Sequence, residues 1–314
     1  MGKTQICDFL FLYNTVKQVI DDGLDIKLKI FYFSLEMTKE EKMRSAFSNI
    51  LFLKEGVMIS PKDLKSTKGV LPEEVVELIE KHQVYFDAIE EIVTFIDDVR
   101  NPTGIYKMMT NYAKDNGTIH TKTIHTKSGD KNIFDHYEPK DPEEYVMCIV
   151  DHIALIIPDT IDGRKLSLYD SITLLSSNYF VRLRNMYNYI PVAIQQQASS
   201  QESVENAKAN KLKPSLDGLG DNKTTQRDAN VILGLFSPFR HEIAECYGYD
   251  VTFFKDNIRF LEILGGREGG AGVIAPLYFN GAVNYFKELP LPTAKTAMSG
   301  VSKFVNRWRN YGKE

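Results

Sequence analysis

The sequence is poor in cysteine, in long apolar runs and in excess basic charge, and each shortage excludes a class of protein. Among its 314 residues are three cysteines, Cys7, Cys148 and Cys246, which lie far apart and match neither a zinc-ligand spacing nor a disulfide framework. We expect these thiols to be reduced and structural. The longest apolar run, residues 145–158, is interrupted by Asp151 and is too short and too polar to span a bilayer.

Charge and length narrow the class further. The formal net charge of −4 excludes a globally basic nucleic-acid binder but leaves a local basic groove open. The first residues show no basic stretch followed by an apolar segment and a small-residue cleavage site, so we expect no signal peptide and a cytoplasmic location without a membrane. The length fits about two domains, or one large α/β domain with insertions.

Hydrophobic periodicity alternates between strand and helix along the N-terminal half, and the C-terminal third is mostly strand. Helical spacing predicts a helix after Thr38, which forms a capping box with Glu41, and further helices over 72–82, 104–114 and 170–189. Apolar runs predict strands at 29–37, 92–96, 145–157, 190–194, 229–236, 258–264 and 272–279. This order favours an α/β fold with a largely parallel twisted sheet, flanked by helices, and antiparallel C-terminal strands.

Three segments depart from this core pattern. Residues 117–140 are polar and repeat Ile-His-Thr-Lys, which is typical of an exposed hairpin or loop insertion. Residues 195–223 are rich in Gln, Ser, Asn and Lys, and favour a long mobile loop. The basic C-terminal tail, 291–314, predicts either an amphipathic helix or a frayed end.

The first residues contain half of a phosphate-binding motif. Gly2-Lys3-Thr4 matches the end of the G-x-x-x-x-G-K-[ST] loop. In that loop backbone amides surround the phosphates, the lysine binds the β and γ phosphates, and the hydroxyl binds Mg²⁺. A tripeptide of this kind also arises by chance at the start of a helix, so alone it decides nothing.

Two acidic residues end predicted strands. Asp151 closes the apolar segment 146–151, where a buried strand would deliver its carboxylate to the sheet edge that holds Mg²⁺ in phosphate-loop ATPases. The alternative is a strand-terminal Asp that caps a helix. Glu36 lies at the end of the strand at 29–37, where a carboxylate can act as a general base on water. The alternative is a solvated Glu favoured by a helix dipole.

Motifs in a fixed order resemble the ATPase domain of DnaB-type replicative helicases, a branch of the RecA-like superfamily. The phosphate loop of that family ends Met-Gly-Lys-Thr, as in residues 1–4, and its next strand ends Ser-Leu-Glu-Met, as in residues 34–37. Later segments resemble further family motifs in family order along nearly the whole chain. They are Phe95-Ile96-Asp97-Asp98 with Pro102 and Ile105, Asp151 with His152, Ile190-Pro191-Val192 leading to Gln197, Asp228-Ala229-Asn230, and Arg267-Glu268-Gly269 with Gly272.

The resemblance implies an ATP site with Mg²⁺. Gly2, Lys3 and Thr4 would bind the nucleotide phosphates, and Thr4 with Asp151 would hold the metal ion. Glu36 would be the catalytic base. The family pattern also places Met1 inside the phosphate loop, so the first strand of the sheet and the first loop glycine would lie upstream. We expect a truncated or miscalled start, and a chain that lacks half of its phosphate cradle when tested alone.

The resemblance also implies a ring. Gln197 would couple the state of the γ-phosphate to a DNA-binding loop at 198–223. Arg267 would serve as an arginine finger on the nucleotide of a neighbouring subunit in a homo-oligomer, expected to be a hexamer. One departure concerns this contact, because Gly265 stands where the family has a lysine. The RecA-like domain would occupy 1–290.

A second departure lies in the DNA-binding loop. Gly218-Leu219-Gly220 replaces the family's Asp-Leu-Arg, so the basic residue is absent. Lysines nearby are candidates for contacts to DNA phosphates, although scattered lysines on a solvated loop are the equally weighted alternative. These lysines are Lys211, Lys213 and Lys223.

Taken together, the motifs predict a helicase ATPase domain of a phage or bacterial replication system. It would hydrolyse ATP to translocate on single-stranded DNA, with a primase and a helicase loader as further partners. Two alternatives stay open: a RecA-like ATPase that remodels or recombines DNA, and a non-catalytic assembly or DNA-binding subunit with the same fold.

Overall fold

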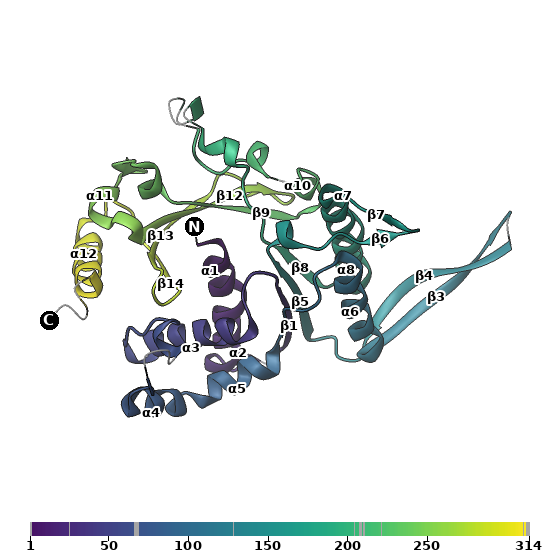
Figure 1. Cartoon of the computed structure of the whole chain (residues 1–314), viewed down its shortest axis with the longest axis horizontal. Helices are drawn as coiled ribbons and strands as arrows, with labels where there is room; N and C mark the ends of the chain where they lie inside the picture. The colour runs from purple at the N-terminus through teal and green to yellow at the C-terminus, as the bar shows by residue number, and fades with distance from the viewer. Residues whose placement is uncertain are drawn as a thin grey trace.

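Two four-stranded sheets organise the computed structural model (Figure 1), which describes residues 2–24, 26–65, 69–127, 129–203, 205–206, 209, 211–220, 222–309 and 311. The parallel sheet, in the order β2-β1-β5-β8, consists of β1 (Lys27–Ser34), β2 (Val93–Ile96), β5 (Glu144–Asp151) and β8 (Ile190–Ala193). The antiparallel sheet, in the order β14-β13-β12-β9, consists of β9 (Val231–Phe236), β12 (Ile258–Gly266), β13 (Ile274–Asn280) and β14 (Tyr285–Glu288).

Helices cover both faces of the parallel sheet. Two of them are continuous through π-helical turns: α1 (Lys3–Asp8) leads through Phe9–Tyr13 into α2 (Asn14–Asp21), and α7 (Leu168–Thr173) leads through Leu174–Phe180 into α8 (Val181–Tyr187). The others are α3 (Lys39–Glu55), α4 (Glu73–Lys81), α5 (Gln83–Ile92), α6 (Pro102–Asp115), α10 (Thr225–Asp228), α11 (Val251–Phe254) and α12 (Lys295–Arg309). Short ribbons pair β6 (Thr160–Ile161) with β7 (Arg164–Lys165), and β10 (Glu245–Cys246) with β11 (Tyr249–Asp250).

The alternation of side chains along β1 explains why the sheet is covered on both faces. Phe31 and Phe33 enter the core beneath α6, α7 and α8, whereas Ile30 and Tyr32 enter the core beneath α2, α3 and α5. Successive side chains of a strand point to opposite faces, so a strand that is apolar throughout needs a helix layer on each side. The predicted α/β class is confirmed by this arrangement.

Side chains of α1 and α3 tie the parallel part to the antiparallel sheet. Gln5 Nε2 donates to the Gly281 carbonyl over 3.0 Å, and Asn49 Nδ2 donates to the Val283 carbonyl over 3.1 Å. Both acceptors lie in the turn between β13 and β14. The turn is therefore held against the helices that begin at the carboxyl edge of the parallel sheet.

The local signals are placed correctly at most element ends, with one clear error. Thr38 and Glu41 form the predicted capping box at the start of α3. The strand predicted over 145–157 instead ends at Asp151, because the chain turns there into a short 3₁₀ segment. The three cysteines are buried and unpaired, as expected. None of the helices in the described ranges has the length and apolar character needed to cross a membrane.

Residues 117–140 form the predicted hairpin. Its arms, β3 (Gly117–Thr126) and β4 (Gly129–Pro139), project from the body as a two-stranded ribbon (Figure 1). Only the base is anchored, where Ile119, Phe134 and Tyr137 pack on the core beneath α6 and α8.

Because the outer hairpin buries little, we predict that it adds little stability. Replacing residues 122–133 with Asn-Gly joins Thr121 to Phe134 through a two-residue turn. The described residues of that stretch are exposed apart from the half-buried Thr126, so the free energy of unfolding in urea should change by less than about 0.5 kcal/mol. Phe134→Ala, which removes a ring 5.9 Å from that of Tyr187, should cost at least about 1 kcal/mol. A trimmed hairpin as destabilising as Phe134→Ala would contradict this account.

Candidate nucleotide-binding site

The register of the parallel sheet brings three loops together at one edge. Ser34 at the end of β1 lies opposite Asp151 at the end of β5, and Val150 lies opposite Ala193 at the end of β8. The carboxyl ends of parallel strands meet at the same edge, which is where open α/β sheets bind ligands. The loops after these strands carry Glu36, His152 and Gln196.

Side chains of these loops contact one another. His152 Nε2 lies 3.9 Å from Glu36 Oε2 and 3.3 Å from Gln196 Nε2. His152 is buried, whereas Glu36 is exposed. The carboxylate of Glu36 is thus held at the mouth of the site, where solvent reaches it.

The start of α1 faces the same edge. Gly2 has a φ of 111°, a left-handed conformation that favours glycine, and it precedes the first turn of the helix. Thr4 Oγ1 donates a hydrogen bond to Asp151 Oδ1 over 3.0 Å. The backbone amides at a helix start carry partial positive charge, so this edge suits an anion such as phosphate.

Lys3 adds a cation beside this helix start. Partial burial, followed by the nearby Arg240 guanidinium, lowers the pKa of the Lys3 ammonium, while the Glu36 and Asp151 carboxylates act in the opposite sense. Arg240 in turn forms an ion pair with Glu202 at 3.0 Å. The site therefore contains a lysine within the influence of both candidate carboxylates.

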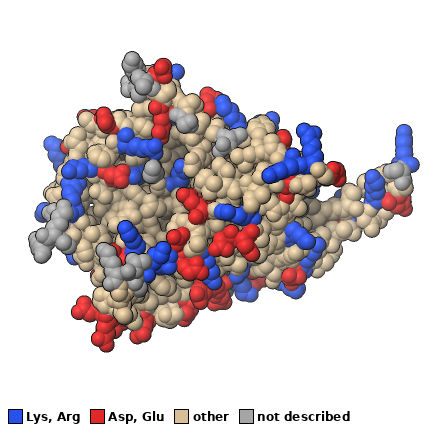
Figure 2. Space-filling model, viewed as in Figure 1, with Lys and Arg blue, Asp and Glu red and all other residues tan. Residues whose placement is uncertain are grey.

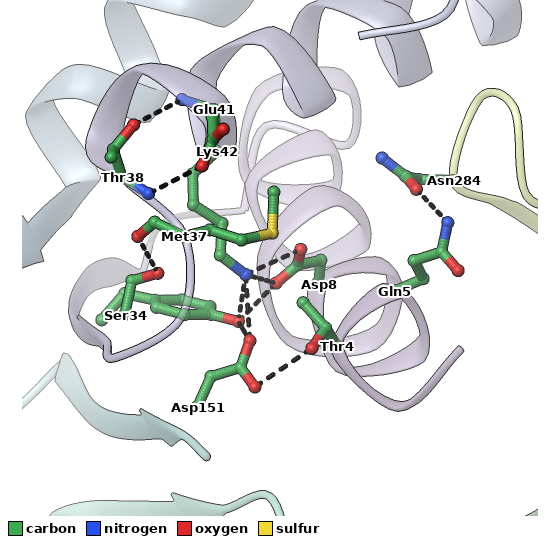
Figure 3. A network of polar contacts seen from close by, with 11 residues as sticks. Thr4, Gln5, Asp8, Ser34, Met37, Thr38, Glu41, Lys42, Asp151 and Asn284 are labelled. Atoms are coloured by element: carbon green, nitrogen blue, oxygen red, sulfur yellow. Dashed lines mark hydrogen bonds and ion pairs between the residues drawn. The ribbon is translucent and has the colours of Figure 1, made fainter. Parts of the chain in front are cut away.

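Beneath the site lies a buried polar network (Figure 3). Lys42 Nζ donates to Asp8 Oδ2 at 3.1 Å, to the Tyr32 hydroxyl oxygen at 2.6 Å and to Asp151 Oδ2 at 3.2 Å. The Tyr32 hydroxyl lies 2.6 Å from Asp8 Oδ1 and 3.0 Å from Asp151 Oδ2. Asp8, Lys42 and Asp151 are 2%, 2% and 1% exposed. Burial raises the pKa of the Asp8 carboxyl, and the Lys42 ammonium opposes this rise.

The oxygen set at this edge fits Mg²⁺ held together with a nucleotide. Mg²⁺ in such sites is bound through one or two carboxylates and the substrate phosphates, with water completing its shell. The Thr4 hydroxyl and the Asp151 carboxylate supply oxygen ligands of this kind, and they are already in contact. Among the described residues there is no cluster of three or more His, Cys, Asp or Glu side chains that would hold a metal ion by itself.

Gln197 and Arg267 lie outside this cluster of contacts. Gln197 forms an isolated bridge with Leu219, and its side chain lies against Gly218, whereas the neighbouring Gln196 reaches His152. Arg267, just after β12, is exposed and donates from Nη2 to the Arg227 carbonyl over 2.7 Å. In the described part of the chain no contact joins Arg267 to Thr4 or to Asp151.

The candidate DNA-binding lysines lie on the polar segment after β8. The bridge at Leu219 and the hydrogen bond from Gly220 N to Gln196 O (3.0 Å) close the base of this segment. Lys213 Nζ stacks 4.0 Å from the centre of the Tyr247 ring, and Lys211 and Lys223 are exposed. Figure 2 shows Lys and Arg side chains dispersed among acidic ones on the face in view, with no single basic surface.

Sequence reasoning missed the network residues and the contact of Gln196, although signals for two of them were present. Asp8 is the one charged residue in the apolar run 6–13. Lys42 lies one helical turn before the fully buried Ala46, on the core-facing side of α3. A charged side chain on a buried face needs a partner, so the two positions could have been linked.

Solved structures share this architecture. A DnaB-like replicative helicase, solved with attention to its interactions with primase, matches with a TM-score of 0.62 and 16% identity over 91% of this chain and 56% of that one. A separately solved helicase ATPase domain matches with a TM-score of 0.62 and 15% identity over 89% of this chain and 80% of that one. The chain has the RecA-like fold of DnaB-type helicase ATPase domains. It spans little more than half of the first of these proteins.

The match rests on structure and not on sequence similarity. No protein-family model and no curated protein sequence matches the chain. At 15–16% identity, the shared fold leaves the activity to be argued from the residues of the site.

We predict that Thr4→Val lowers stability without ligand. The change keeps the side-chain shape but removes the hydroxyl donor to Asp151 Oδ1, and the loss of a hydrogen bond to a buried charge costs about 1–3 kcal/mol. The measurement is urea unfolding at neutral pH. The control, Thr15→Val, removes a hydroxyl that donates to the Phe11 carbonyl over 2.8 Å, and it should cost less because that acceptor is neutral. Equal losses would argue against an ionised Asp151 that depends on Thr4.

Proposed function

We propose that this chain is the ATP-hydrolysing domain of a DnaB-type replicative helicase, which translocates on single-stranded DNA as a hexameric ring. The observation that supports it is the meeting of Thr4, Glu36 and Asp151, from three separate elements, at the carboxyl edge of the parallel sheet. A cytoplasmic replication system of a phage or bacterium would use it, with a primase and a loader as partners.

The residues present divide the work of phosphoryl transfer among them. Gly2 and Lys3 would bind the phosphates, and Thr4 and Asp151 would hold Mg²⁺. When bound, Mg²⁺ neutralises charge that develops on the phosphate oxygens. Glu36 is solvent-exposed at the mouth of the site, where its carboxylate would accept a hydrogen bond from the attacking water and polarise it.

Coupling to DNA would use the segment closed by the Leu219 bridge. Gln197 lies at the base of that segment and Gln196 contacts His152, which follows Asp151. A change in the phosphate state would therefore be passed from this edge to residues 198–223. Exposed lysines there would grip DNA phosphates without reading base sequence; they are Lys211, Lys213 and Lys223.

Glu36→Gln should separate nucleotide binding from hydrolysis. Loss of a general base typically lowers the turnover rate by about 10²–10⁴-fold, while Mg²⁺-ATP affinity should stay within about twofold of the unmodified chain. Turnover is measured by phosphate release and affinity by equilibrium titration. Glu40→Gln, at an exposed position on the first turn of α3, is the matched control and should retain full turnover.

The other outcomes discriminate among the readings. Persistent turnover in Glu36→Gln would remove Glu36 from the reaction. ATP binding without turnover in the unmodified chain, assembled with any upstream segment, would favour a non-catalytic subunit. Hydrolysis stimulated by single-stranded DNA without unwinding of a forked duplex would favour a DNA-remodelling or recombination ATPase.

Arg267 provides a test of the ring. Arg267→Ala alone should lose about 10³-fold or more in turnover, since arginine fingers contribute about 10³–10⁵. Mixing it with Glu36→Gln should restore part of the rate, because some interfaces then combine an intact Glu36 with an intact Arg267 from the neighbour. Phosphate release after subunit exchange is the measurement. A mixture no more active than its components would contradict action between subunits.

A further inference from the structure

The two oxygens of the Asp151 carboxylate face different partners (Figure 3). Oδ1 accepts from the Thr4 hydroxyl over 3.0 Å, on the side of the start of α1. Oδ2 lies 3.2 Å from Lys42 Nζ and 3.0 Å from the Tyr32 hydroxyl. With 1% exposure, this side chain depends on protein partners for its orientation.

Lys42 is satisfied by the network around it. An ammonium has three hydrogens to donate, and the groups around Nζ are the Asp8 carboxylate, the Tyr32 hydroxyl and Asp151 Oδ2. Nζ also lies 4.2 Å from the centre of the Tyr32 ring. The aliphatic part of Lys42 comes from the early turns of α3, so the network joins α1, α3, β1 and β5.

The charges do not cancel within the network. Two carboxylates, Asp8 and Asp151, share one ammonium, so the buried group carries an excess negative charge when both acids are ionised. Lys42 occupies the Oδ2 side, which leaves Oδ1 and the Thr4 hydroxyl as the side from which a further cation can approach. Lys42 therefore orients the carboxylate without blocking that approach.

We propose that Asp8, Lys42 and Tyr32 form a positioning network that holds Asp151 with Oδ1 toward Thr4, ready for a divalent cation bound together with nucleotide phosphates. The inference rests on the proposed function for the identity of that ligand. Residues behind a metal ligand commonly contribute 10–100-fold to metal affinity because they orient it.

The test removes the ion pair as a unit. Asp8→Leu with Lys42→Met keeps the net charge of the cluster, so a change in cation affinity reports lost positioning and not altered charge. Apolar replacement of a buried ion pair is often neutral for stability, whereas removal of one partner leaves an unpaired buried charge. The readout is the dissociation constant of Mn²⁺ in the presence of ADP, measured by electron paramagnetic resonance on the full chain.

The chain contains a matched control. Asp21, Lys54 and Tyr85 repeat the same three residue types at the surface: Lys54 Nζ lies 3.0 Å from Asp21 Oδ2 and 4.3 Å from the centre of the Tyr85 ring. Lys54 also belongs to α3. Asp21→Leu with Lys54→Met thus makes the same chemical change on the same helix, away from Asp151.

The expected result is Mn²⁺ binding weakened about tenfold or more in Asp8→Leu/Lys42→Met and unchanged within about twofold in the control pair. Wild-type affinity in a cooperatively melting Asp8→Leu/Lys42→Met variant would overturn the proposal. If that variant does not fold, Tyr32→Phe decides, since it retains both charges and removes one donor to Oδ2; unchanged affinity there would overturn the proposal as well. Failure of the unmodified chain to bind Mn²⁺ with ADP would instead overturn the proposed function and this inference with it.

Discussion

The parallel pairing of β1 with β5 is the constraint on which the rest of the site depends. Eight residue pairs, from Lys27 opposite Glu144 to Ser34 opposite Asp151, bring the two strands to the same edge. A shift of one residue would turn every side chain of β5 to the other face. Asp151 would then leave Thr4 and Lys42, and the apolar side chains of β5 would exchange the two cores. Burial on both faces thus holds the register that the chemistry requires.

The network under Asp151 shows how this fold accommodates charge inside an apolar layer. Removing carboxylates and an ammonium from water costs several kcal/mol per ion, and the cost is offset only where geometry and hydrogen bonds are good. Here Asp8, Lys42 and Asp151 satisfy one another and Tyr32 across four elements. Buried charge is a poor route to stability alone, so its concentration beneath the candidate ATP site indicates a function at that site.

The antiparallel sheet gives the molecule a second working surface. α1 and α3 hold its β13–β14 turn through Gln5 and Asn49, so the sheet is attached to the helices that frame the site. Arg267 follows β12 and makes no described contact with Thr4 or Asp151, although it belongs to the same chain. A residue so placed meets a nucleotide site most directly on another copy, which is the physical basis for proposing a ring.

Local patterns in the sequence determined the elements: the capping box at Thr38, the apolar runs of the parallel strands and the hairpin at 117–140 all lie where short-range chemistry put them. They also determined that Asp151 ends a strand, although the strand was extended too far, since an apolar run does not reveal where the chain turns. Contacts between distant segments were decided only by the tertiary structure. Asp8 and Lys42 meet across 34 positions, Gln196 and not Gln197 touches His152, and the antiparallel strands form a sheet of their own. Such pairings depend on how layers pack in space, which periodicity along one segment does not encode.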